Sequence, residues 1–109
     1  MKIQDYHFHI YYLEPDIQLA KSIVKNVISK YDVEVGRFHE KPVGPHPMCS
    51  VQLVVSNENF SNILQWFILN REKLTVFIHP NTGNAFLDHT DHVLWLGESV
   101  KLNLEIFNS

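Results

Sequence analysis

The sequence has little cysteine, no long apolar run and no concentration of positive charge. Its single cysteine, Cys49, excludes a disulfide within the chain and a zinc site built from cysteines. No apolar run is long enough to span a membrane and no charged and apolar signal segment opens the chain, so we expect a cytoplasmic protein that does not bind membranes. Nine basic residues against twelve acidic ones give a net charge of −3 without a basic block, which argues against a nucleic-acid partner.

Histidine, by contrast, is abundant. The chain has 109 residues, 45% of them hydrophobic, which is enough for one domain spanning residues 1–109. Seven of these residues are histidines: His7, His9, His39, His46, His79, His89 and His92. The question that the sequence raises is what these imidazoles do.

The spacing of apolar residues predicts an α+β fold. Alternation of apolar and polar residues predicts strands at 6–12, 33–38, 48–55 and 74–79. Apolar residues three and four apart predict two helices, the first within 14–31 and the second within 60–68. The order β-α-β-β-α-β is the ferredoxin-like arrangement, with both helices on one face of an antiparallel sheet. A C-terminal extension, with a short strand around 102–107, is expected to help cover the other face together with a partner subunit.

Three histidine segments converge on that other face. In the strand 6–12 the apolar positions should face the helices, which sends His7, His9 and Tyr11 to the open face. The neighbouring strand 74–79 sends Phe77 and His79 to the same side, although the register between the strands cannot be read from the sequence. The loop that leads into the strand 48–55 carries His46 between two prolines, so that few conformations are open to it.

Convergent neutral imidazoles suit a divalent transition metal such as Zn, Fe, Cu or Ni. Two ligand sets stay open, three histidines or two histidines and one carboxylate. A carboxylate that orients a ligand is also expected, and the acidic residues available for these tasks are Glu14, Glu40, Asp88 and Asp91. Each histidine motif alone is equally typical of a solvated strand or a tight turn, and only their convergence favours a metal site.

Four motifs together resemble the DOPA 4,5-dioxygenase family. They are the strand YHFHIYY at 6–12, the loop PVGPHP at 42–47, the turn HPNTG at 79–83, and the pair DHT at 88–90 with LWLG at 94–97. They occur in the family's order and cover nearly the whole chain. The resemblance implies a small ferredoxin-like protein, often dimeric, that cleaves a catechol ring by Fe(II)-dependent extradiol chemistry with O2.

The resemblance also implies roles for individual histidines. It favours His9, His46 and His79 as metal ligands for Fe(II), with Zn or another divalent metal as an alternative occupant. It leaves His7 and His89 for proton transfer beside the metal, a role that suits an imidazole because its pKa lies near working pH. The remaining histidines, His39 and His92, are expected on the surface.

Three further residues are predicted to contact the substrate. Tyr11 and Phe77, on the same face as the histidines, are expected to stack on an aromatic ring. Arg37 is the cation best placed near the loop 41–47 to bind a carboxylate.

The leading hypothesis is therefore an extradiol dioxygenase that acts on L-DOPA or a related catechol with O2, as a homodimer. The alternative is a non-catalytic ferredoxin-like module that binds a metal or a small molecule, because a fold does not imply a function. An RNA-binding domain suits the topology, but the charge argues against it.

Overall fold

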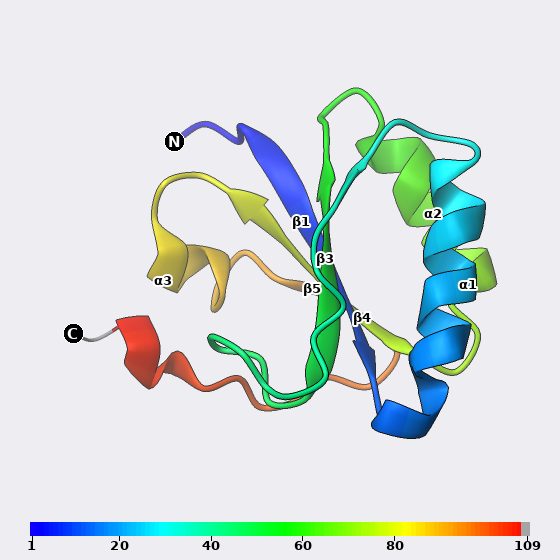
Figure 1. The fold of residues 1–109 in the computed structure, drawn as a ribbon. Coiled ribbons are helices and arrows are strands. Elements are labelled where there is room, and N and C mark those ends of the chain that lie inside the picture. The colour runs from blue at the N-terminus through cyan, green and yellow to red at the C-terminus, as the bar shows by residue number, and fades with distance from the viewer. Residues whose placement is uncertain (108–109) are drawn as a thin grey trace.

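Two helices pack against one face of a five-stranded antiparallel sheet (Figure 1). The structure is a computed structural model and describes residues 1–107. The sheet has the order β2-β3-β1-β4-β5. Its strands are β1 (Asp5–Tyr12), β2 (Glu34–Val35), β3 (Cys49–Val55), β4 (Thr75–Asn81) and β5 (Leu94–Leu96), and the two helices are α1 (Ile17–Ile28) and α2 (Phe60–Asn70).

The central strand β1 pairs with β3 on one side and with β4 on the other, both antiparallel. This order confirms the ferredoxin-like prediction, in which the first strand lies between the third and the fourth. The register places His7 directly opposite His79 on β4, and His9 opposite Gln52 on β3. The pairing therefore brings residues about 70 positions apart in the sequence side by side.

The core lies between the helices and the sheet and follows the predicted alternation. Phe8, Ile10 and Tyr12 of β1 are buried there, and the stripe of α1 packs onto them. These β1 residues are at most 1% exposed. Because side chains alternate along a strand, burial of this set leaves His7, His9 and Tyr11 on the opposite face, as predicted.

One strand prediction was too long and another was wrong. The segment 33–38 forms only the two-residue strand β2, because after Val35 the backbone keeps single hydrogen bonds to β3, from Gly36 to Gln52 and from His39 to Ser50, instead of a continuous ladder. The segment around 102–107 forms a 3-10 turn, η2 (Leu104–Phe107), and the additional strand is β5, which pairs with β4.

The chain beyond Gly83 covers part of the face that carries the histidines. Figure 1 shows the short helix α3 (Ala85–Asp88) and the C-terminal segment on the side of the sheet away from α1 and α2. The indole of Trp95 in β5 stacks on Phe77, with ring centroids 4.5 Å apart, and the backbone of Asn103 is hydrogen bonded to Pro45. Among residues 1–107, no helix is both long and apolar enough to span a membrane.

Candidate metal centre

Three histidines on β1 and β4 bring their ring nitrogens together. One nitrogen from each of His7, His9 and His79 lies within 4.8 Å of the other two. The Nε2 atoms of His9 and His79 are 3.0 Å apart, and the ring of His7 lies 5.1 Å from that of His79. This group arises from the register of β1 and β4, and it shares His9 and His79 with the ligand set predicted from the sequence.

The protonation of His79 is defined by its backbone partner. Its Nδ1 lies 2.8 Å from the carbonyl oxygen of Pro80. Because a carbonyl oxygen only accepts hydrogen bonds, Nδ1 carries the proton, and Nε2 presents a lone pair toward His9. In the metal-free protein Nε2 of His9 donates to this lone pair at 3.0 Å. A ring held through Nδ1 in this way has the arrangement usual for a histidine that ligates a metal.

Burial keeps these rings neutral near pH 7. His9 and His79 are 3% and 4% exposed. Desolvation, with the neighbouring imidazoles, holds the pKa of His9 well below its usual value. Burial also lowers the pKa of His79 to about 4, although the hydrogen bond to Pro80 opposes the shift. The pKa of His7 is lowered by burial too, against a smaller opposing effect of Asp5. Neutral imidazole is the form that binds a metal.

The remaining predicted ligand, His46, lies beside this group with a different partner. Its ring centroid is 4.1 Å from that of His9, and its Nδ1 is 2.6 Å from the hydroxyl oxygen of Tyr11. Burial lowers the pKa of His46 to about 4 and raises that of Tyr11, so both groups are neutral near pH 7. The structure therefore brings His46 to the cluster but outside the three nitrogens that lie closest together.

Substituting Tyr11 with Phe should remove this buried hydrogen bond and leave Nδ1 of His46 unpaired. We expect the free energy of unfolding to fall by about 1–3 kcal/mol, because a buried polar atom without a partner costs its full desolvation penalty. Urea unfolding of the metal-free protein measures this loss. Tyr6→Phe on the same strand is the matched control, since the Tyr6 hydroxyl makes no hydrogen bond within residues 1–107. Equal losses in the two variants would contradict the prediction.

A cleft of about 340 Å³ opens beside the cluster. Five of the seven histidines line it: His7, His9, His46, His79 and His89. The ring of His89 lies 4.1 Å from that of His79, and the ring of Phe107 in η2 lies 4.7 Å from that of His89. The cleft therefore leaves space for a small molecule next to the group that can hold a metal.

The predicted substrate contacts lie elsewhere. Phe77 is fully buried beneath the ring of His9, and Tyr11 is 1% exposed, so both support the histidines from below and neither lines the cleft. Arg37 is exposed on the segment after β2 and also does not line the cleft. The amide side chains that do line it are Gln52 and Asn81. Gln52 could have been found from the sequence, since it is polar at an open-face position of a strand rich in Val and Leu.

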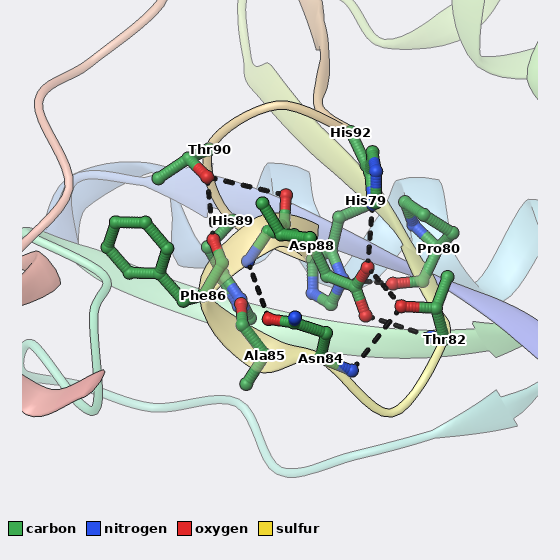
Figure 2. Close-up of polar contacts among 11 residues, drawn as sticks. His79, Pro80, Thr82, Asn84, Ala85, Phe86, Asp88, His89, Thr90 and His92 are labelled. Carbon is green, nitrogen blue, oxygen red and sulfur yellow. Dashed lines mark hydrogen bonds and ion pairs between the residues drawn. The ribbon is translucent and has the colours of Figure 1, made fainter. Parts of the chain in front are cut away.

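His92 was expected on the surface, but it is half-buried and bonded to Asp88. Asp88 itself is 3% exposed and accepts hydrogen bonds from Nδ1 of His92 and from the backbone and hydroxyl of Thr82 (Figure 2). Burial alone would raise the pKa of this carboxyl group, but these hydrogen bonds outweigh it and the pKa is lowered. Asp88 is thus an ionised carboxylate at the rim of the cluster.

These features define a class of protein: a small ferredoxin-like domain whose open sheet face holds a histidine-lined cleft able to bind a divalent metal. Residues 6–106 match the model of the Dopa 4,5-dioxygenase family, and the chain belongs to this family. The resemblance drawn from the four motifs is therefore confirmed. The family and the names of its members point to a dioxygenase-like enzyme.

Individual relatives agree with this membership. The DOPA 4,5-dioxygenase of Amanita muscaria is 31% identical over 94% of this chain, which covers 49% of that protein. An uncharacterized 21.2 kDa protein of Botryotinia fuckeliana is 29% identical over 90% of the chain, which covers 60% of that protein. The chain thus spans about half the length of the curated relatives it matches.

A crystal structure of a protein from Nostoc punctiforme, provisionally named a dioxygenase, superimposes with a TM-score of 0.94. The two proteins share 34% sequence identity, and the match covers 97% of this chain and 92% of that one. The chain therefore shares the fold of the Nostoc punctiforme protein over nearly its full length.

Proposed function

We propose that this protein is a non-haem Fe(II) extradiol dioxygenase that opens the ring of L-DOPA or a related catechol with O2. The observation that carries the proposal is the group of three ring nitrogens from His7, His9 and His79 beside an open cleft. Family membership supports the reaction type. The finer points, which are the metal, the extradiol position and the substrate, rest on the chemistry of these residues.

The donor set fits a divalent transition metal. An imidazole nitrogen lies about 2.0–2.1 Å from a bound zinc ion, so two such donors at right angles stand about 3 Å apart. The Nε2 atoms of His9 and His79 are separated by 3.0 Å. Three nitrogen donors on residues that line an open cleft suit a metal that keeps open positions for substrate and O2. Fe(II) is the proposed occupant, and Zn or another divalent ion would fit the same donors.

We assign the ligand roles to His9 and His79, with His7 as the third ligand by its distance to them. His46, the third ligand predicted from the sequence, lies next to His9 and is the competing candidate. The chemistry supplied by bound Fe(II) is orientation of the catechol beside O2 and transfer of electrons between them. The protein's own contribution is to hold the donors in a buried, neutral state.

His89 is the proposed proton acceptor. Its Nδ1 lies 2.7 Å from the carbonyl oxygen of Ala85, so Nδ1 carries the proton and Nε2 has a free lone pair. Burial lowers the pKa of His89, which keeps the ring neutral near pH 7 despite the nearby Asp88 carboxylate. A neutral imidazole on the cleft wall can accept a hydroxyl proton from a catechol as the ring is attacked.

Ring opening is tested with the Fe(II)-loaded protein prepared without oxygen. On addition of air and L-DOPA or a simple catechol, we expect one molecule of O2 to be consumed per molecule of catechol. Both oxygen atoms should appear in a yellow ring-opened product, because extradiol cleavage needs no other reductant. An oxygen electrode and mass spectrometry measure the two quantities.

The zinc-loaded protein is the control for this assay, since zinc has no redox chemistry and should give no uptake. Bound metal without oxygen uptake for any catechol would support the alternative of a non-catalytic binding module.

The homodimer and the cytoplasmic location stay predictions of the sequence. The sequence predicts a dimer because it leaves one sheet face uncovered, whereas the structure covers part of that face with the chain's own residues after Gly83. A second subunit would therefore add to a cover that already exists.

A further inference from the structure

Asp88 is a buried carboxylate that touches no residue of the three-nitrogen group by a hydrogen bond. One oxygen accepts from the backbone N–H of Thr82 at 2.8 Å, and the other accepts from the Thr82 hydroxyl at 2.7 Å and from Nδ1 of His92 at 2.9 Å. Figure 2 shows the carboxylate between these two partners. His79 nearby is oriented by the carbonyl of Pro80 instead. All the hydrogen bonds of the carboxylate described above are therefore made within the segment 82–92.

The helix that carries Asp88 is too short to be stable alone. α3 has four residues, and a single turn gains few hydrogen bonds for the conformational freedom it loses. Asn84 caps its first turn by accepting from the N–H of Leu87. Asp88 adds the connection to the sheet, because Thr82 directly follows the end of β4. These bonds to a charged acceptor are stronger than bonds between neutral groups.

The position of His89 depends on this connection because His89 is the next residue. Its ring lies 4.1 Å from that of His79 and 4.7 Å from that of Phe107. The bond from its Nδ1 to Ala85 also needs the turn to be formed, since Ala85 is one helical turn earlier. If the turn opened, His89 would lose both its place in the cleft and the partner that defines its tautomer.

We propose that Asp88 is the positioning residue of His89: by tying α3 to the end of β4 through Thr82, and by holding the turn after α3 through His92, it keeps the cleft-lining residue His89 in place with Nε2 as its proton acceptor. The inference rests on the proposed function for the task of His89. It goes beyond that function in assigning the residue that acts through His89.

The first test reads the tautomer of His89 directly and needs neither metal nor turnover. In long-range 15N-1H NMR spectra of the metal-free protein, His89 should show protonated Nδ1 and unprotonated Nε2. In Asp88→Ala, and to a smaller extent in Asp88→Asn, signals of both tautomers should appear because the bond to Ala85 is no longer held.

Asp91→Asn is the matched control for this experiment, because Asp91 is an exposed carboxylate three residues after Asp88. This variant should leave the His89 signals unchanged. Unchanged His89 signals in both Asp88 variants would overturn the proposal. If Asp88→Ala does not fold, Asp88→Asn decides alone.

The second test separates positioning from general destabilisation by a double-mutant cycle on kcat. Asp88→Asn should lower kcat about 10–100-fold, as is usual for residues that orient a functional histidine. In a His89→Ala background the same change should have little further effect, because the group through which Asp88 acts is gone. An equal fold-change in the two backgrounds would overturn the proposal.

The two tests distinguish a failure of the proposed function from a failure of the role proposed for Asp88. If the wild-type protein opens no catechol, the proposed function fails while the tautomer of His89 still reports on Asp88. If the enzyme is active and the Asp88 variants leave the tautomer unchanged and are additive with His89→Ala, the inference fails alone.

Discussion

His79→Ala is expected to abolish retention of a divalent metal and to lower kcat more than about 100-fold, beyond what loss of an orienting residue alone would cause. The reason is that His79 supplies one of the two nitrogens that face each other at 3.0 Å, and its ring is held by Pro80 so that no other orientation competes. Metal content after dialysis, measured by elemental analysis, and oxygen uptake with a catechol check the two effects. Circular dichroism shows whether the variant is folded.

His39→Ala is the control for this result. His39 is half-buried on the segment after β2 and lies outside the three-nitrogen group, so its loss should leave metal retention intact. Metal retained by His79→Ala but lost from His39→Ala would reject the assignment.

The third ligand is decided by comparing His7→Ala with His46→Ala. His7 belongs to the three-nitrogen group, so His7→Ala should lose the metal. His46 lies outside that group and is bonded to Tyr11, so His46→Ala should retain the metal and show altered kinetics. The reverse pattern would favour the set His9, His46 and His79 predicted from the sequence.

The metal-free protein should become much less stable between pH 6.5 and pH 4. Burial lowers the pKa of His46 and of His79 to about 4, whereas in the unfolded chain both titrate near 6.5. Between these values the unfolded state binds protons that the folded state does not, so the free energy of unfolding falls as the pH falls. Each ring can contribute up to about 3 kcal/mol over this range, at about 1.4 kcal/mol per pKa unit.

Urea unfolding with a chelator present, repeated across this pH range, measures the slope. The double variant His46→Gln and His79→Gln has lost two of the rings whose pKa is lowered by burial and should show a flatter slope, and the slope that remains includes the contributions of His7, His9 and His89. An equally steep slope in that variant would contradict the prediction. Because protons compete with the metal for the same nitrogens, metal binding should weaken in the same direction.

The fold was predictable because its pattern is local. Alternation along β1 separates Phe8 and Ile10 from His7 and His9, and it depends only on the geometry of a strand. The stripe on α1 follows the same logic with a helical period. The short strands were less predictable: β2 stops after Val35, and β5 forms at Leu94–Leu96 instead of near residue 102, because pairing at a sheet edge depends on which segment reaches the neighbouring strand.

The site was predictable in its location and less so in its detail. The sequence placed His7, His9, His46 and His79 at one face, the family resemblance added His89, and all five line the same cleft. The amides of Gln52 and Asn81, and the burial of Tyr11 and Phe77 beneath the rings, came from the structure. Whether a side chain on a given face lines a cleft or lies below it depends on what covers it, here Trp95 and His46.

By itself, the sequence determined the fold class, the family and the face on which the imidazoles gather, because periodicity and ordered motifs are properties of the chain. Only the tertiary structure decided that His7 pairs with His79, that Nδ1 of His46 is bonded to Tyr11, and that Asp88 ties α3 to Thr82. Register and hydrogen-bond partners are set by contacts between distant segments, and a shift of one residue in β1 would turn every histidine on it to the other face.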